Sequence, residues 1–549
     1  MKRVVIIGGV AGGMSVATRL RRLDESASII VLERSAHVSY ANCGLPYYVG
    51  GVIESEEDLL LQTPDSLHRR FDLDVRVRTE ALSVDASTRR VRVRDLTSGQ
   101  EYDLDYDALV LSPGAAPIIP PLPGIERAYP LRTVEDVERL REVVEGQPRH
   151  AVVIGGGFIG LEIAENLRHR RVDTTIVEAA AQVLAPLDVE MARLVSDELE
   201  SQGVRVYLND SVAALTEDAV VLASGERLAA DLVIVAIGVR PDTTLARNAG
   251  LAIGARGGIE VNGFNQTSDP AIYALGDAAE KMDALDGAAT LVPLANIANR
   301  HGRLVADHIA GREVRPRTTI GTAIVKVFGL TVAVTGWSEK RLAAAGREFV
   351  AVHTHPSSHA GYYPGAVPMA LKILVDPSTG RVLGAQAVGT EGVDKRIDVL
   401  ATAIRGNITA PELADLELAY APPFGSAKDP VNMLGYVAQN VLSGLERTVQ
   451  WHEVLARREG GSVLIDVRGA AEFARGTLPG ALNIPVDELR ARHHEIGAAP
   501  VVVFCQVGQR GHVATQLLTQ LGYDVANLDG GYATWNHSPA SRELLASPC

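Results

Sequence analysis

Residues 151–160 read AVVIGGGFIG and decide the fold of this 549-residue chain. Ala151 to Ile154 predicts a buried strand, and the pattern Gly155-x-Gly157-x-x-Gly160 follows it directly. A helix with apolar residues comes next, and a strand over 174–177 ends in Glu178, about 20 residues after the glycines. Such glycines let the backbone approach a pyrophosphate at the helix N-terminus, and the carboxylate accepts ribose hydroxyls. The stretch therefore predicts a Rossmann-like dinucleotide-binding unit.

The N-terminus repeats this arrangement roughly 150 residues earlier. A strand over 4–7 leads into Gly8, Gly9, Val10, Ala11, Gly12 and Gly13, with Val10 standing where the strict pattern has glycine. A second strand over 28–32 ends in Glu33, again about 20 residues after the glycines. We therefore expect two dinucleotide sites in one chain. At the second site, Glu178 has no arginine beside it and would repel a 2′-phosphate, which favours NADH over NADPH.

Composition limits the partners. The net charge is −14, which argues against nucleic acid because phosphate binding needs a basic surface. The chain has three cysteines, too few for a disulfide framework, so we expect a cytoplasmic protein. Met1 leads straight into a strand without a signal-like apolar region, and no apolar run is long enough to span a membrane.

Cys43 is the first candidate redox residue. Pro46 predicts a helix start close by, and the dipole at a helix N-terminus favours a thiolate. Ser39 and Asn42 give the cysteine polar neighbours, which argues against a merely buried apolar side chain. Tyr48 stands where a second cysteine would be needed for a local disulfide. Cys43 therefore needs an external sulfur partner or a sulfenic acid to cycle.

The first predicted helix carries Ser15, Arg19 and Arg22 on one face. This stripe is either an ordinary solvated basic face or a cationic track for substrate phosphates. Short strands are expected over 75–118, ending in Ser112, Pro113 and Gly114, and the proline-rich stretch 117–123 predicts a domain crossing.

The two signatures, together with a closing Gly238 and the run from Thr267 to Ala278, resemble the two-dinucleotide flavoprotein disulfide reductases over about residues 1–445. The resemblance implies FAD, NADH and a homodimer. It implies an FAD site at Gly8, Val10, Ala11, Gly12, Gly13, Glu33, Arg34, Asn42, Ser112, Pro113, Gly114, Gly276 and Asp277. It implies an NADH site at Gly155, Gly157, Phe158, Ile159, Gly160, Glu178 and Gly238.

The run from Ser39 to Tyr47, with its single cysteine, is similar to the coenzyme A-disulfide reductase and NADH-dependent persulfide reductase family. There the cysteine forms a mixed disulfide with coenzyme A, and a tyrosine pair reaches the partner subunit's cysteine site. These roles map to Cys43 and to Tyr362 and Tyr420. The coenzyme A residues would be Ser15, Arg19, Arg22, Ser39, Asn42, Arg70 and Lys428, with Arg70 replacing the basic residue that Phe71 displaces.

The C-terminal segment carries a second candidate cysteine. A strand over 501–504 delivers Cys505 to the loop Cys505-Gln506-Val507-Gly508-Gln509-Arg510, which precedes a helix. Backbone N–H groups, the helix dipole and Arg510 would stabilise a thiolate or persulfide, which argues against an inert core cysteine. Down to Asp529 and Trp535, this segment resembles a rhodanese domain; related phosphatase loops are one residue longer. Cys549 is expected to be an inert tail residue.

We therefore expect an α/β chain with two Rossmann-like domains, an α+β dimerisation domain and a C-terminal α/β rhodanese domain. The expected bounds are 1–118 with 267–320 for FAD, 119–266 for NADH, 321–445 for dimerisation, 446–455 for a linker and 456–549 for rhodanese. The expected activity is FAD-dependent, NADH-driven reduction of persulfides and polysulfide, including coenzyme A persulfide, by a chain that binds no metal. Three alternatives stay open: coenzyme A-disulfide reductase, NADH oxidase or peroxidase, and sulfurtransferase or redox sensor.

Overall fold

The computed structural model describes the chain from Lys2 to Ala546, so Cys549 lies outside the described residues. The chain folds into two compact units, residues 1–181 with 203–321 and residues 182–202 with 322–549. Among the helices of residues 2–546, none combines the length and apolar character that crossing a bilayer requires.

The first unit begins with a parallel sheet in the order β18-β7-β1-β2-β3. Its strands are β1 (Arg3–Ile7), β2 (Ser28–Leu32), β3 (Asp74–Arg76), β7 (Ala108–Leu111) and β18 (Ile272–Ala274). Successive side chains of β1 point to opposite faces. Val4 and Ile6 pack in one apolar core, and Val5 and Ile7 pack in the core on the other face. Burial on both faces explains the unbroken apolar sequence of β1.

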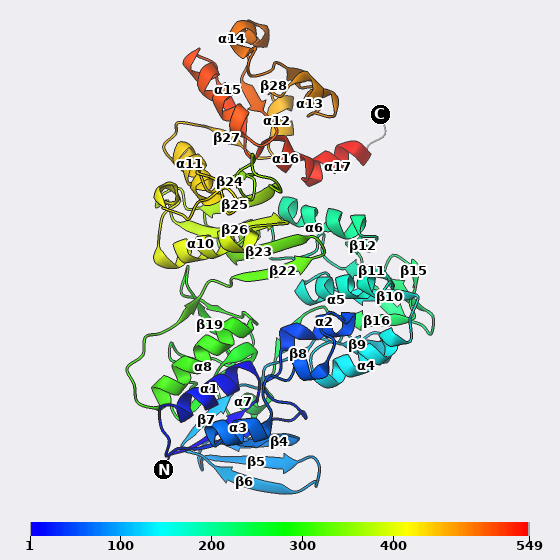
Figure 1. Cartoon of the computed structure of the whole chain (residues 1–549), viewed down its shortest axis with the longest axis vertical. Coiled ribbons are helices and arrows are strands. Elements are labelled where there is room, and N and C mark those ends of the chain that lie inside the picture. The colour runs from blue at the N-terminus through cyan, green and yellow to red at the C-terminus, as the bar shows by residue number, and fades with distance from the viewer. Residues whose placement is uncertain (1, 547–549) are drawn as a thin grey trace. The chain divides into compact units, whose positions relative to one another are not determined.

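Helices α1 (Ala11–Arg21) and α8 (Ala295–Ile309) cover one face of this sheet (Figure 1). They approach each other closely at Gly302, where a Cβ atom would lie 2.7 Å from the carbonyl oxygen of Gly12. An antiparallel sheet of β4 (Thr79–Asp85), β5 (Arg90–Asp95) and β6 (Glu101–Asp105) contributes to the other core. The expected short strands before residue 118 are therefore present.

A second parallel sheet in the first unit has the order β12-β11-β10-β16-β9. Its strands are β9 (Ala128–Pro130), β10 (His150–Ile154), β11 (Asp173–Glu178), β12 (Arg205–Leu208) and β16 (Leu232–Val235). Helix α5 (Phe158–His169) follows β10 as expected. The chain crosses between the two sheets through β8 (Ala115–Pro117), which pairs antiparallel with β17 (Val239–Pro241) beside the proline-rich stretch.

The second unit contains an antiparallel sheet in the order β22-β23-β26-β25-β24. Its strands are β22 (Ala323–Val327), β23 (Leu330–Gly336), β24 (Val350–Thr354), β25 (Met369–Val375) and β26 (Val382–Gly389). Helices α10 (Val393–Gly406) and α11 (Pro430–Leu442) pack against it, as does α6 (Val189–Ser201), which comes from the middle of the expected NADH region.

The C-terminal α/β domain has a parallel sheet in the order β27-β31-β30-β28-β29. Its strands are β27 (Thr448–Val449), β28 (Val463–Asp466), β29 (Leu482–Asn483), β30 (Val501–Phe504) and β31 (Val525–Leu528), and helix α15 spans Gln509–Gln520. The structure differs here from the expectation of a plain linker over 446–455. Thr448 and Val449 pair with Asn527 and Leu528, so this segment is the edge strand of the sheet.

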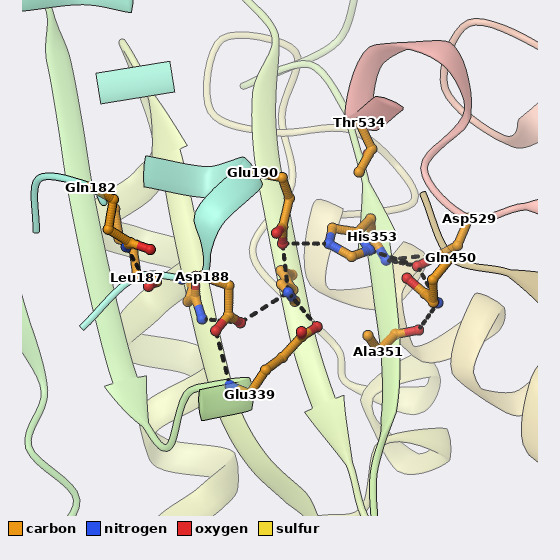
Figure 2. A network of polar contacts seen from close by, with 12 residues as sticks. Gln182, Leu187, Asp188, Glu190, Glu339, Ala351, His353, Gln450, Asp529 and Thr534 are labelled. Atoms are coloured by element: carbon orange, nitrogen blue, oxygen red, sulfur yellow. Dashed lines mark hydrogen bonds and ion pairs between the residues drawn. The ribbon is translucent and has the colours of Figure 1, made fainter. Parts of the chain in front are cut away.

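A buried polar network attaches the C-terminal domain to the antiparallel sheet (Figure 2). His353 on β24 lies between two carboxylates: its Nδ1 is 2.6 Å from Asp529 Oδ2, and its Nε2 is 3.0 Å from Glu190 Oε1 on α6. The backbone N–H of His353 also donates to Asp529. Burial alone would lower the pKa of His353, but the carboxylates of Asp529 and Glu190 raise it to about 9. The C-terminal domain is therefore held by a histidine that carries a proton at neutral pH.

Lys372 on β25 extends this network. Its ammonium lies 2.5 Å from Glu190, 2.9 Å from Asp188 and 2.7 Å from Glu339. Burial opposes the charge, but these carboxylates raise the pKa of Lys372. The three carboxylates lie close enough together to resemble a cation site, and the ammonium contacts all three of them.

We expect replacing His353 by glutamine to lower the free energy of unfolding of this unit by about 3 kcal/mol, because Asp529 remains buried without its cation and Glu190 keeps only Lys372. The folded-state pKa of His353 lies above its unfolded value of about 6.5. Its stabilisation is therefore complete below that pH and is lost as the pH rises through about 9. Thermal unfolding between pH 6 and 10 measures both effects.

The matched control is His494→Gln, which changes an exposed histidine of the same unit. It should leave the unfolding midpoint and its pH dependence unchanged. A His353→Gln protein whose midpoint falls with pH as steeply as that of the wild type would contradict the prediction.

Candidate active site

The first glycine loop forms a close turn between β1 and α1. Gly8 has a φ of 103°, and a Cβ atom there would lie 2.0 Å from the carbonyl oxygen of Ser112. A Cβ on Gly13 would lie 1.9 Å from the carbonyl oxygen of Gly8. Within the described chain, the N–H groups of residues 11–13 have no backbone acceptor. Such unpaired N–H groups at a helix N-terminus suit a pyrophosphate.

Glu33 closes this loop at the end of β2. One of its carboxylate oxygens accepts the Gly9 N–H at 2.8 Å, and the other accepts from the N–H and hydroxyl of Ser35 at 2.9 Å. The neighbouring Arg34 is largely exposed and lies 3.9 Å from Glu80. The structure therefore fixes the expected ribose acceptor beside the glycine loop.

The end of β7 and the short helix η4 (Gly276–Ala278) complete the cradle. The Ser112 hydroxyl lies 2.8 Å from where a Cβ of Gly12 would be and 3.5 Å from where a Cβ of Gly276 would be. Asp277 accepts from Arg132 at 3.0 Å. The expected residues from three separate segments thus meet at one place. A side chain at Gly12 would collide with the Ser112 hydroxyl there. The first cradle fits a dinucleotide.

The second glycine loop reproduces the first. A Cβ on Gly160 would lie 2.0 Å from the carbonyl oxygen of Gly155, which has a φ of 107°. Glu178 accepts the N–H of Gly156 at 2.7 Å and that of Ala180 at 2.8 Å. Gly238, at the end of β16, has a φ of 110°. Gly9 and Gly156 were not predicted as site residues. The structure identifies them, because each donates its N–H to the carboxylate that closes its loop.

Cys43 lies on the short helix η1 (Asn42–Gly44), which runs into α2 (Leu45–Gly50). Cys43 is exposed and free. The Oδ1 atom of its neighbour Asn42 is buried and, among the described residues, has no hydrogen-bond partner. An unpaired buried acceptor is costly unless a ligand satisfies it. This orphaned atom supports the expected binding role of Asn42.

The expectation of a stabilised Cys43 thiolate requires a correction. Desolvation is the main factor that raises the pKa of the Cys43 thiol, followed by the carboxylates of Glu162 and Asp277; Arg132 opposes them only in part. Helix α2 has only six residues, so its dipole is weak. The chain by itself therefore favours the thiol form of Cys43.

Glu162 on α5 was not identified from sequence. The Tyr47 hydroxyl donates to its carboxylate at 3.4 Å. Burial raises the pKa of Glu162 to about 7, and burial together with Glu162 raises that of Tyr47 to about 12. A carboxyl group with a pKa near neutrality beside a redox cysteine can hold or release a proton.

The basic stripe on α1 is only partly free for a ligand. Ser15 donates to Asn299, and Arg19 forms an ion pair with Asp307 at 2.8 Å, so both contact α8. Asp307 also lies 4.0 Å from Arg303 and from Arg312, two cations that sequence reasoning missed. Several cations therefore share one carboxylate, and the local charge remains positive.

Arg22 and Arg70 are exposed. The guanidinium of Arg22 lies over the ring of Phe71, 6.0 Å from its centroid. Phe71, which stands where the family has a basic residue, thus contacts the basic stripe through its ring. Ser39 has a φ of 51°, and its N–H donates to the carbonyl of Gly9, which ties this segment to the first glycine loop.

The expected tyrosine pair lies in the second unit. The hydroxyls of Tyr362 and Tyr420 are 2.8 Å apart, and 76% of Tyr362 and 47% of Tyr420 are exposed. Phe424 and Lys428 are exposed in the same segment. The structure therefore brings the two tyrosines together on an open aromatic surface.

Cys505 follows β30 and begins the loop that leads into α15. The carbonyl of Cys505 accepts the N–H of Tyr532, and that of Gln506 accepts the N–H of Ala533. Within the described residues, the N–H groups of residues 506–510 have no backbone acceptor, so they form an anion cradle. The sequence argued against a core cysteine, yet Cys505 is buried in the core of this domain. The Cys505 residue is therefore buried and is followed by the anion cradle.

Arg510 also interacts with the Cys505 thiol. Its guanidinium forms two parallel hydrogen bonds to Glu472, of 2.7 and 2.8 Å. Arg468 contacts the loop through Gln506 at 3.1 Å and is paired with the buried Asp466 at 2.7 Å. Glu472 was missed from sequence because about forty residues separate it from Arg510.

Three protein families match successive parts of the chain. Residues 2–302 match the pyridine nucleotide-disulphide oxidoreductase family, residues 322–430 match its dimerisation domain, and residues 450–538 match the rhodanese-like domain. These matches confirm the expected classes of domain and their order.

Curated relatives include the coenzyme A disulfide reductases of Staphylococcus haemolyticus, 34% identical, and Staphylococcus aureus, 33% identical. Each match covers 80% of this chain and 100% of the relative. Among solved structures, reduced Bacillus anthracis CoADR-RHD is 47% identical, with a TM-score of 0.97 over 98% of this chain and 99% of the other. A NAD-dependent persulfide reductase from A. fulgidus is 38% identical, with a TM-score of 0.92 over 97% of this chain and 100% of the other.

Proposed function

The chain belongs to the pyridine nucleotide-disulphide oxidoreductase family, whose members use FAD and NAD(H), and we propose that it reduces persulfides and polysulfide with electrons from NADH. In this proposal, coenzyme A persulfide is a substrate, and the rhodanese domain handles sulfane sulfur. When bound, FAD would supply the redox chemistry: it would take a hydride from NADH and pass two electrons to sulfur.

The two cradles would hold the two dinucleotides. The N–H groups of residues 11–13 and the Glu33 carboxylate suit FAD, and Asp277 lies at the same cradle. The Gly155–Gly160 loop and Glu178 suit NADH, because the Glu178 carboxylate would repel a 2′-phosphate. The second cradle therefore favours NADH over NADPH.

Cys43 would carry the sulfur chemistry. Its thiolate attacks the inner sulfur of coenzyme A persulfide, so that a Cys43–coenzyme A mixed disulfide forms and HS⁻ leaves. Two electrons that originate from NADH then break the mixed disulfide and return both sulfurs to thiolates. Glu162, with a pKa raised to about 7, is placed to hold a proton near this sulfur.

Coenzyme A would lie along the cationic surface of α1. Arg19, Arg22 and Arg70 would meet its phosphates, with Ser15, Ser39, Asn42 and Lys428 as further contacts. We also propose a homodimer, in which Tyr362 and Tyr420 reach the partner subunit's cysteine site. Their exposure and their mutual hydrogen bond support this role, because an exposed aromatic pair gains from being covered.

One observation carries the proposal: a single chain holds a lone cysteine beside a dinucleotide cradle and a second cysteine in an anion cradle. The reductases from staphylococci match 80% of this chain, whereas the persulfide reductase from A. fulgidus matches 97% of it. Coenzyme A disulfide reduction is the second candidate and uses the same residues. Both cysteines within residues 2–546 are free, which suits the reducing cytoplasm, where we place the protein.

The test is anaerobic NADH oxidation by the FAD-loaded enzyme, with coenzyme A persulfide, polysulfide and coenzyme A disulfide compared side by side. We expect kcat/KM to be at least about tenfold higher for persulfide or polysulfide, with one sulfide released per NADH. Cys505→Ser tests whether sulfur must pass through the rhodanese domain.

Preference for coenzyme A disulfide would overturn the proposal in favour of the second candidate. Rapid NADH oxidation by oxygen or peroxide alone would indicate an oxidase or peroxidase. A lack of steady NADH turnover with every sulfur acceptor would indicate a sulfurtransferase or redox sensor.

A further inference from the structure

Both arginines at the Cys505 loop are already neutralised by carboxylates. Arg510, the arginine of the loop itself, binds Glu472 through two hydrogen bonds of 2.7 and 2.8 Å. Arg468, which reaches the loop through Gln506, binds the buried Asp466 through its Nε and Nη2 atoms. The sequence of the Cys505 loop predicts a positive charge, but the carboxylates of Glu472 and Asp466 neutralise it.

Glu472 is held in place from two sides. Besides Arg510, it accepts the N–H of Gly469 at 3.2 Å and so caps the start of α13 (Ala470–Ala474). The hydrogen bond from Arg510 is the main cause that lowers the pKa of Glu472 to about 2, so the carboxylate stays ionised at neutral pH. The pair is a fixed, neutral unit beside the buried sulfur.

Besides Arg510, which also interacts with the Cys505 thiol, the donors at the loop are the N–H groups of residues 506–510. Backbone amides without a backbone acceptor can stabilise an anionic sulfur, but they carry no net charge. Thiosulfate brings two negative charges, and its sulfonate group stays next to the reacting sulfur as the sulfite leaving group. A persulfide or polysulfide brings at most one charge to its terminal sulfur. The loop therefore matches the second kind of donor.

We propose that Glu472 is a specificity-determining residue of the Cys505 site: by neutralising the charge of Arg510, it selects persulfides and polysulfide as sulfur donors and rejects thiosulfate. This inference rests on the proposed function, because it names the donor class of its sulfurtransferase domain. Glu472 acts through Arg510, which interacts with the Cys505 thiol.

The transfer step is balanced without any oxidant. The Cys505 thiolate attacks the terminal sulfur of the donor, a bond forms between Sγ and that sulfur, and the donor's S–S bond breaks. The bonding pair leaves with the donor as a thiolate, so a persulfide replaces a persulfide. When cyanide is the acceptor, it removes the terminal sulfur as thiocyanate and restores the Cys505 thiolate.

The experiment measures thiocyanate formation by the full-length, FAD-loaded protein without NADH, with thiosulfate and glutathione persulfide as donors. We expect the wild type to use the persulfide with a kcat/KM at least about 100-fold higher. Glu472→Gln frees the charge of Arg510 and should raise kcat/KM for thiosulfate about tenfold, while the persulfide value changes less than about threefold. The gain should shrink as salt is added.

Glu495→Gln is the matched control. Glu495 binds Arg492 through two bonds of 2.7 and 2.8 Å in the same domain, away from the loop, and its loss should leave donor preference unchanged. A folded Glu472→Gln protein whose thiosulfate value stays the same or falls would overturn the inference. If Glu472→Gln does not fold, the wild-type protein decides: a thiosulfate value equal to or above the persulfide value overturns the inference.

The two proposals fail separately. Donor preference is measured without NADH, so it holds or fails whatever the reductase substrate is. Thiocyanate formation that persists in Cys505→Ser would instead remove the sulfurtransferase part of the proposed function.

Discussion

Cys43→Ser is expected to lower kcat/KM for NADH-dependent reduction of persulfide, polysulfide and coenzyme A disulfide by at least about 1,000-fold. A serine hydroxyl cannot form the mixed disulfide, and the sequence places no second cysteine near residue 43. The measurement is anaerobic NADH consumption with each acceptor, and FAD content is checked by absorbance.

Electron transfer to an artificial acceptor separates the chemistry of Cys43 from damage to the fold. Cys43→Ser should still pass electrons from NADH to ferricyanide at close to the wild-type rate, because both glycine cradles are unchanged. Cys505→Ser is the paired control, which removes a cysteine from the other unit and should retain reduction of coenzyme A disulfide. Full persulfide turnover in Cys43→Ser would refute the mechanism.

Gly13→Ala is expected to lower the FAD content of the purified protein by about tenfold or more. A Cβ at this position would lie 1.9 Å from the carbonyl oxygen of Gly8, and neither backbone segment can move without opening the loop. Displacing the loop misaligns the N–H groups that suit the pyrophosphate. The ratio of flavin absorbance to protein absorbance measures the loss.

Gly361→Ala is the control for this substitution. Gly361 lies in the other unit and has no positive φ, and a Cβ atom added there would meet no other atom within 4 Å. It should keep full FAD content and the same unfolding midpoint. Normal FAD content in Gly13→Ala would show that the close approach at Gly8 is not needed for binding.

Desolvation of the Cys43 thiol and the carboxylates around it explain why local sequence misjudged its ionisation. Pro46 correctly marked the start of a helix after the cysteine. The opposing charge comes from Glu162 on α5 and Asp277 on η4, both distant in sequence. A dipole can be inferred from neighbouring residues, whereas the pKa depends on every group that the fold brings near.

Cys505 likewise has some properties that follow from local sequence and others that depend on the fold. The sequence correctly placed Cys505 between a strand and a helix, and it identified Arg510 as the nearby cation. The neutralisation of Arg510 by Glu472 depends on how α13 packs beside the loop. The network that joins His353 to Asp529 and Glu190 likewise unites three segments separated by more than a hundred residues.

The amino-acid sequence by itself determined the two glycine cradles, the position of each candidate cysteine just before a helix and the order of the domains. These features depend on local rules: apolar runs make buried strands, glycines permit close turns, and a carboxylate follows at a fixed distance. Only the tertiary structure decided the raised pKa of Cys43, the cancelled charge at Cys505 and the attachment of the C-terminal domain through His353. Each depends on burial or on charges from distant segments, and neither can be read from neighbouring residues.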